Sequence, residues 1–452
     1  MSLVANLETN LGVNPENNAP EIWSCDSLLR VLFLGTLMFV VFFISEHDPQ
    51  MALVADFVTD IELQESWADG GNPLRRVGFL ALAALGLIGM AFGKWGGFRL
   101  CVPVVLMAVY VVWCGATYTW SIDPPTTLRR FIVMLCCIVG CFGVSRYYQP
   151  REVIFSVVLA FGGFLLIAIA AEIYFGAFRP HHGGFRFAGT AHPNSQAAYL
   201  SMLCIALVTL AILDAKRRVM FLALLAVAFL FLILTKSRTS ALAMLFSLGS
   251  IWFFRQSTRS LTLATALGTW AASFLVLLLL STGIDPIADY YDVLMMGRAE
   301  ETDGASLTGR MPLWQELASY IKHRPWQGHG FRAFWTARNI NDIAETQEWV
   351  VSEAHSSYVE ATLQVGIIGC LLMIAVAFAT LWFAVVQYRI TRQPEFLFII
   401  GGVVFSVIRG FSESGLSGPT AFTSFLFVTM FAQRWNSSPD AIDLASDHPP
   451  NE

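Results

Sequence analysis

The sequence is dominated by long apolar runs separated by short polar segments. Twelve runs can each cross a bilayer as one helix, which needs about 20 apolar residues. They lie at 28–45, 77–93, 100–117, 131–145, 152–173, 195–213, 219–235, 239–254, 261–282, 361–386, 396–411 and 419–433. Only 13% of the residues are charged, whereas a soluble domain carries about 25%. We therefore expect an all-α, polytopic membrane protein with about 12 transmembrane helices.

The short loops indicate how this chain is oriented. With a cytoplasmic N-terminus, five inner loops (94–99, 146–151, 214–218, 255–260 and 387–395) hold 11 Lys or Arg among 32 residues. The positive-inside rule favours this orientation. Four arginines at predicted outer helix ends are exceptions to the rule: Arg75, Arg76, Arg129 and Arg130.

Three parts of the chain follow from this topology. Residues 1–27 are predicted to be a cytoplasmic segment, 28–433 the membrane domain, and 434–452 a disordered cytoplasmic tail. The membrane domain includes an extracytoplasmic loop, 283–360, between helices 9 and 10. A helix is expected at 312–323 in this loop, with Pro312 in its first turn. Loops of this length usually carry function.

Composition and motifs exclude several classes of protein. The net charge is −5 without a basic run, so nucleic-acid binding is not expected. The eight cysteines lie in or beside apolar runs and form no C-x-x-C pair, which favours small buried hydrophobic residues. A P-loop, a nucleophile elbow and a D-x-D pair are absent from the sequence. We therefore expect neither a nucleotide-dependent enzyme nor a protease, and no cofactor.

Four polar stretches lie at predicted outer helix ends: 179–199, 235–240, 306–335 and 353–360. Each adjoins a membrane span, so Arg186, Arg238, Arg310 and His355 are expected to meet near the outer membrane boundary. Arginine matches phosphate oxygens with a rigid fork of donors, which suits a lipid diphosphate. His355 is a candidate general base, and Glu353 is a second candidate.

The polar stretches also resemble a known family. The sequence contains, in this order, WSIDPPTTLRR, RFAGTAHPNSQAAYLSML, TKSRTSALAML, SLTGRMPLW, RPWQGHGFRAFW and AHSSYVEATLQVGIIG. As an ordered set they resemble the O-antigen ligase and Wzy-type polysaccharide polymerase superfamily. The resemblance implies an inverting, metal-independent glycosyltransferase of the bacterial inner membrane. Its donor would be an undecaprenyl-diphosphate-linked glycan at the extracytoplasmic face, and its acceptor a glycan or a lipid core. The matching positions are Arg186, Arg238, Arg310 and His355.

Weaker substrate-binding candidates lie in the same stretches: Lys236, His192, Asn194, His329 and Arg332. Each has a structural alternative. Arginines at helix ends often anchor a span at the head-group level, His329 reads as a turn residue, and Asn194 reads first as the N-cap of the sixth helix. The spacing of His181, His182 and His192 fits no common metal site.

Two functional classes remain open at this point. A transporter or lipid-linked oligosaccharide flippase is the alternative to the enzyme. A two-halves transporter would place a long cytoplasmic loop between helices 6 and 7, but that loop, 214–218, is short. Within the enzyme class, a polymerase and a ligase differ in their acceptor, and the sequence favours the polymerase only slightly.

Overall fold

The computed structural model describes residues 24–48, 73–92, 98–182, 185–256, 307–347, 351–416 and 418–436. Regular structure within these ranges is helical throughout. Seven helices are long and apolar enough to cross a membrane. They are α2 (Cys25–Glu46), α4 (Pro73–Phe92), α5 (Val102–Ala116) with the 3₁₀ turn Thr117–Trp120, α6 (Pro124–Ser145), α7 (Pro150–Tyr174), α8 (Pro193–Leu213) and α16 (Ser357–Thr391). The chain is a polytopic, all-helical membrane protein.

Four shorter helices complete the bundle. They are α9 (Arg218–Leu234), α10 (Arg238–Arg255), α17 (Glu395–Arg409) and α18 (Ala421–Asn436). Eleven of the twelve predicted apolar runs are therefore helical, and the run at 261–282 lies outside the described residues. Two further helices, α14 (Leu307–His323) and α15 (Ala337–Gln347), belong to the predicted outer loop.

Two helices differ from the sequence-based expectation. The helix expected at 312–323 begins at Leu307, so Pro312 lies inside α14 rather than in its first turn. The run at 361–386 belongs to a 35-residue helix, α16, that is broken at Gly366, where φ is 71°. Only glycine adopts this backbone conformation readily. In addition, a Cβ at this position would lie 2.1 Å from the carbonyl O of Trp326.

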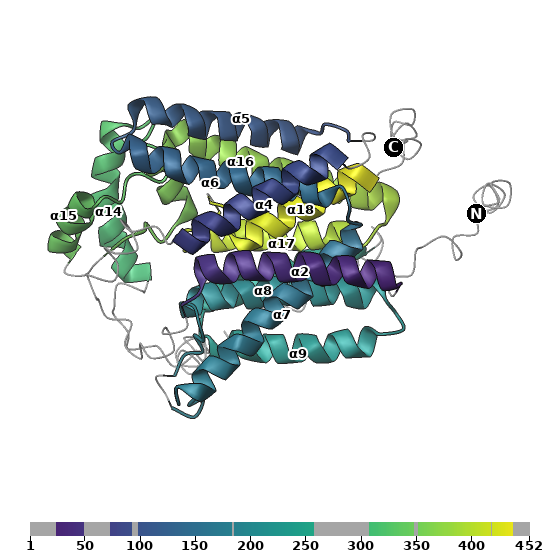
Figure 1. Ribbon diagram of the computed structural model, residues 1–452. Coiled ribbons are helices and arrows are strands. Elements are labelled where there is room, and N and C mark those ends of the chain that lie inside the picture. Colours follow the sequence, from purple (N-terminus) through teal and green to yellow (C-terminus); the bar gives the residue numbers. More distant parts are fainter. Residues whose placement is uncertain are drawn as a thin grey trace, which may run out of the picture.

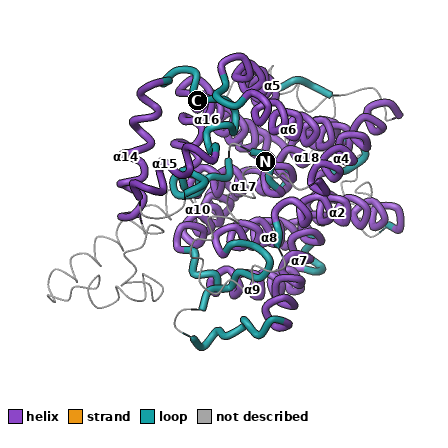
Figure 2. Tube along the Cα trace, turned by 60° about the vertical axis from the view of Figure 1, so that its left-hand side comes forward, coloured by secondary structure: helices purple, strands orange, loops and turns teal. Residues whose placement is uncertain are grey.

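The helices pack around a buried centre. Figures 1 and 2 show them side by side, with α14 and α15 at one end of the bundle. The span in α8 is 83% buried, whereas the other candidate spans are at most half buried, as expected for helices that face lipid. α4 and α6 approach closely because glycines meet at their crossing. A Cβ at Gly86 would lie 2.4 Å from the carbonyl O of Val139.

Contacts between helix ends define the two ends of the bundle. At one end, Ala421 N–H donates to Glu46, and Arg324 donates to the carbonyl O of Trp120. At the other end, Arg30 pairs with Glu152. The described parts of all four polar stretches lie at the first end, which we call the site end. The sequence-based prediction that the four polar stretches lie at one end of the bundle is therefore confirmed for their described parts.

Candidate functional site

The candidate site is centred on Glu413, a buried carboxylate in the segment that follows α17. Its Oε1 accepts a hydrogen bond from Asn194 Nδ2 at 2.8 Å and lies 3.4 Å from Arg310 Nη2. Its Oε2 lies 3.7 Å from Arg409 Nη2. Only 7% of the Glu413 side chain and 5% of the Arg310 side chain are exposed. A buried carboxylate requires such partners, because an unpaired charge in the interior is costly.

Asn194 connects a third arginine to this centre. Its Oδ1 accepts from Arg186 Nη2 at 3.0 Å, and its backbone O accepts from Arg409 Nη2 at 3.1 Å. Arg186 also donates from Nε to the carbonyl O of Thr235 at 3.2 Å. The predicted N-cap role of Asn194 is wrong: α8 begins at Pro193, and His192 is the N-cap. Proline suits the first helical position, so the N-cap is the residue before Pro193. The Asn194 side chain can therefore bond to Arg186 and Glu413 instead.

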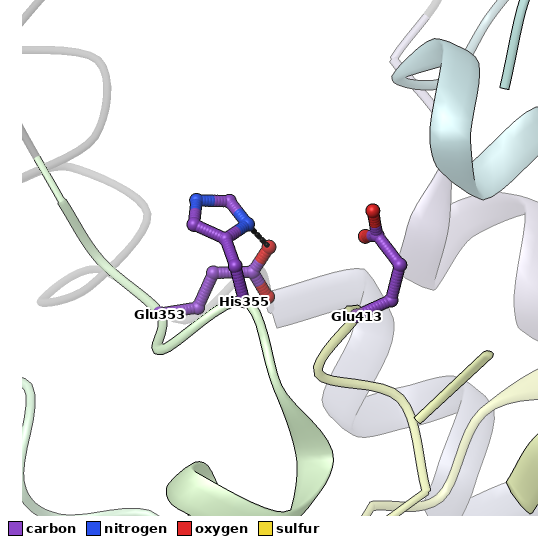
Figure 3. Close-up of side chains that lie close together, drawn as sticks. All are labelled: Glu353, His355 and Glu413. Atoms are coloured by element: carbon purple, nitrogen blue, oxygen red, sulfur yellow. Dashed lines mark ion pairs between the residues drawn. The ribbon is translucent and has the colours of Figure 1, made fainter. Parts of the chain in front are cut away.

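His355 and Glu353 form an ion pair beside Glu413. His355 Nδ1 lies 3.1 Å from Glu353 Oε1, and 23% of the histidine and 42% of the glutamate side chain are exposed. Figure 3 shows the pair on one segment and Glu413 on another, with the three side chains close together. His355 has φ 48°, an uncommon backbone conformation for a residue other than glycine. Such conformations often persist at functional sites because the surroundings enforce them.

Hydrogen bonds hold these two segments together. Ser357 N–H donates to the carbonyl O of Gly410 at 2.8 Å, and Ser357 Oγ donates to the carbonyl O of Glu413 at 2.7 Å. On the other side, Glu360 accepts from Ala354 N–H at 2.8 Å. The residues that flank His355 are therefore fixed on both sides, which places its ring near Glu413.

The pair shifts the titration of both its members. Burial acts to lower the pKa of His355, but the Glu353 carboxylate outweighs it, so the pKa is raised above 6.5. Burial acts to raise the pKa of Glu353, and the positive charge and hydrogen bond of His355 lower it overall. The ion pair between protonated His355 and the Glu353 carboxylate is therefore favoured at acidic pH. His355 loses its proton at a higher pH than an ordinary histidine does.

Three of these residues have the geometry of a metal site. One ligand atom each from Glu353, His355 and Glu413 lies within 4.8 Å of the others. However, Glu413 already faces Arg310 and Arg409, and Glu353 faces His355. A bound cation would have to compete with these positive charges, so the electrostatics oppose a metal although the spacing permits it.

A cavity of about 270 Å³ opens beside the centre. Glu353, Arg409 and Glu413 contribute to its lining, together with one of the weaker sequence candidates, Arg332. Arg310 Nε and Arg409 Nε are buried and have no hydrogen-bond partner among the described residues. N–H groups of this kind can donate hydrogen bonds to the oxygens of an anionic ligand.

The other sequence candidates take different positions. Arg238 begins α10, three residues after Thr235, which contacts Arg186. Lys236 is half-buried and has φ 51°. Burial and the nearby Arg186 charge lower the pKa of His192 to about 4. His329 is buried, with Nε2 3.1 Å from the carbonyl O of Tyr320, and its described contacts support the turn interpretation.

Sequence reasoning missed Arg409 and Glu413 as site residues. Arg409 falls inside a predicted apolar run, 396–411, and Glu413 follows four residues later. An ionisable residue within a membrane segment is by itself a signal of function. This signal, together with the i, i+4 spacing of opposite charges, could have identified the pair.

The sequence of this chain is similar to known proteins. Residues 222–374 match the sequence model of the O-antigen ligase family, Wzy_C. That range includes Arg238, Arg310, Glu353 and His355, whereas Arg186, Asn194 and Glu413 lie outside it. The chain is also 23% identical over 335 residues to the exopolysaccharide production protein ExoQ of Rhizobium meliloti (strain 1021), covering 70% of this chain and 74% of that protein. Part of the chain is therefore similar to the O-antigen ligase family, and most of the chain is distantly similar to this exopolysaccharide production protein.

Proposed function

We propose that the protein is a membrane glycosyltransferase that polymerises lipid-linked repeat units of an exopolysaccharide or O-antigen. The donor is a glycan on undecaprenyl diphosphate, and the acceptor is a hydroxyl of a second glycan. The observation that carries the proposal is the meeting of Arg186, Arg310 and Arg409 around one carboxylate, beside the His355–Glu353 pair. The family match and the exopolysaccharide relative support it.

The arginines suit the leaving group of this reaction. During transfer, the bond between the anomeric carbon and the diphosphate oxygen breaks, and negative charge develops on that oxygen. Guanidinium groups that are already fixed by Asn194 and Glu413 stabilise this charge without having to reorganise. The Nε groups of Arg310 and Arg409 have no hydrogen-bond partner among the described residues, and we propose that they donate to diphosphate oxygens. Undecaprenyl diphosphate then leaves as the product.

His355 suits the role of general base toward the acceptor. Its Nδ1 faces Glu353, which favours a proton on that nitrogen and leaves Nε2 as the acceptor. Nε2 takes the proton of the attacking hydroxyl while the hydroxyl oxygen bonds to the anomeric carbon. Attack from the face opposite the diphosphate inverts the anomeric centre. Glu353 orients the ring and raises its pKa.

The proposal includes the topology on which the site depends. We propose twelve membrane helices over residues 28–433, flanked by cytoplasmic segments at 1–27 and 434–452. The site end faces the outside of the bacterial inner membrane, where 283–360 forms the long loop between helices 9 and 10. Arg238 and Lys236 would then line the approach to the diphosphate, and Arg332 the approach of the glycan.

The test is transfer by the purified full-length protein in proteoliposomes supplied with lipid-linked repeat units. We expect a ladder of polymer and release of undecaprenyl diphosphate, measured by gel and mass spectrometry. His355→Ala should lower the rate about 10²- to 10⁴-fold, and the exposed control Arg338→Gln should not. Glycan capping of a lipid core without a ladder would instead identify a ligase. Movement of unchanged lipid-linked units across the bilayer would identify a flippase and refute the enzyme.

A further inference from the structure

Two additional arginines line the cavity next to the candidate site. Arg75 lies in the first turn of α4, and Arg332 lies between α14 and α15; both contribute to the cavity wall together with Glu46 and Tyr199. The backbone of Arg332 is held in place, because its N–H donates to Gln364 Oε1 at 3.1 Å and its carbonyl O accepts from Arg130. The φ angle of Arg332 is 54°, an uncommon value for a residue other than glycine.

Among the described residues, neither guanidinium forms an ion pair with a carboxylate. Arg75 lies 6.0 Å from the ring centre of Phe79, and no carboxylate among the described residues pairs with Arg75 or Arg332 within 4 Å. The nearest acidic member of the wall, Glu46, already accepts from Tyr199 OH at 2.8 Å and from Ala421 N–H at 3.0 Å. The other charged members of the wall, Glu353, Arg409 and Glu413, have partners within the candidate site. Beside Arg75 and Arg332, two cations therefore face the one carboxylate of Glu46, and an anion between them would be stabilised.

The cavity also has the room and the lining for a sugar. A Cβ at Gly418 would lie 2.3 Å from Arg332 Nη1, so this glycine leaves space for the guanidinium. The volume of about 270 Å³ is near the lower limit of small-molecule pockets, roughly 300 Å³. Hydroxyl-bearing side chains suited to sugar hydroxyls line the wall: Ser45, Ser195, Ser406, Thr420 and Thr423.

We infer that Arg75 and Arg332 form an oxyanion subsite for a carboxylate or phosphate substituent on a sugar of the transferred or accepting glycan. This inference rests on the proposed function, because it places an acidic sugar beside the transfer centre. The subsite adjoins the diphosphate site: Arg409 and Glu413 line the same cavity, whereas Arg186, Asn194 and Arg310 are not among the described residues that line it. The protein would thus select acidic glycans.

The test is binding of three probes to the full-length protein in nanodiscs, measured by ligand-detected NMR titration. The probes are methyl β-glucuronide, the neutral methyl β-glucoside, and farnesyl diphosphate. We expect the glucuronide to bind at least tenfold more tightly than the glucoside. Arg75→Gln and Arg332→Gln should each weaken glucuronide binding about tenfold or more, with little effect on farnesyl diphosphate. The matched exposed controls Arg76→Gln and Arg338→Gln should change neither affinity.

Two further variants distinguish a loss of binding from a loss of folding. Arg75→Lys keeps the charge and should retain most of the glucuronide affinity, and Gly418→Ala should displace the Arg332 guanidinium and weaken that affinity. Equal binding of glucuronide and glucoside would overturn the inference. So would an equal loss of farnesyl diphosphate affinity in the glutamine variants, because the pair would then belong to the diphosphate site. If the wild type binds glucuronide but not farnesyl diphosphate, the subsite stands and the proposed donor does not.

Discussion

Two buried carboxylates at opposite ends of the bundle show how differently these ends are built. Glu152, 1% exposed, pairs with Arg30 at 3.0 Å, accepts from Ser27 and Gln149, and faces one cation that is 44% exposed. Glu413, equally buried, faces Arg310 and Arg409, and Asn194 links it to Arg186. The Glu152 carboxylate is thus matched by one half-exposed cation. Two guanidinium groups face Glu413 directly, as expected where an anionic substrate binds.

The largest test of this comparison removes one arginine from each end. Arg310→Gln should reduce glycan transfer by about 100-fold or more, because a fixed donor to the leaving oxygen is lost. Arg30→Gln should leave transfer within about twofold, since it affects only packing. Rates in proteoliposomes, normalised to folded protein by size-exclusion chromatography, measure both. Similar losses in the two variants would show that the ends do not differ in function.

The second test separates the roles of His355 and Glu353 through pH. Only neutral His355 can accept a proton, and its pKa is raised above 6.5, so the transfer rate should fall as the pH drops through that raised value. Glu353→Gln removes the charge that raises this pKa, and burial then lowers it. The acid limb of the rate profile should therefore move to lower pH, with transfer retained. The exposed control Glu345→Gln should leave the profile unchanged.

The opposite result would reassign the base. A loss of about 10²- to 10⁴-fold in Glu353→Gln at every pH, with transfer retained in His355→Gln, would identify Glu353 as the general base.

A smaller effect is expected from the link between the two site segments. Ser357→Ala removes the hydroxyl that donates to the carbonyl O of Glu413 and accepts from Gly415 and Leu416 N–H at 3.1 Å. Loss of these bonds should cost about 1–2 kcal/mol of local order and lower kcat about tenfold, with KM nearly unchanged. Ser319→Ala, on the exposed side of α14, is the control. A changed KM with normal kcat would place Ser357 at the substrate instead.

The smallest expected effect concerns metal ions. Chelation with EDTA and addition of Mg²⁺ or Mn²⁺ should change the transfer rate less than about twofold, because cations already face Glu353 and Glu413. A rate that falls with EDTA and returns with one metal would show that Glu353, His355 and Glu413 act as ligands.

Local sequence patterns predict the membrane helices and the grouping of the polar stretches at one end of the bundle. Apolar run length predicts a membrane helix without knowledge of its neighbours, and alternating spans bring polar ends to one side. The partner of Arg310 could not be predicted in this way. Glu413 reaches it only because the segment after α17 folds against Ser357, and Asn194 reaches Glu413 across 219 residues of sequence. The helix cap lies at His192 because Pro193 takes the first helical position, whereas α14 begins five residues before Pro312 and contains this proline.

The break at Gly366 divides α16 into two parts that respond to different surroundings. The nine residues before it carry Ser357 and Glu360, which fix the His355 segment. The residues after it, about 37 Å of helix, exceed the hydrocarbon thickness of about 30 Å. A change in the tilt of this long span with bilayer thickness would therefore meet the break at Gly366 before it reached the His355 segment.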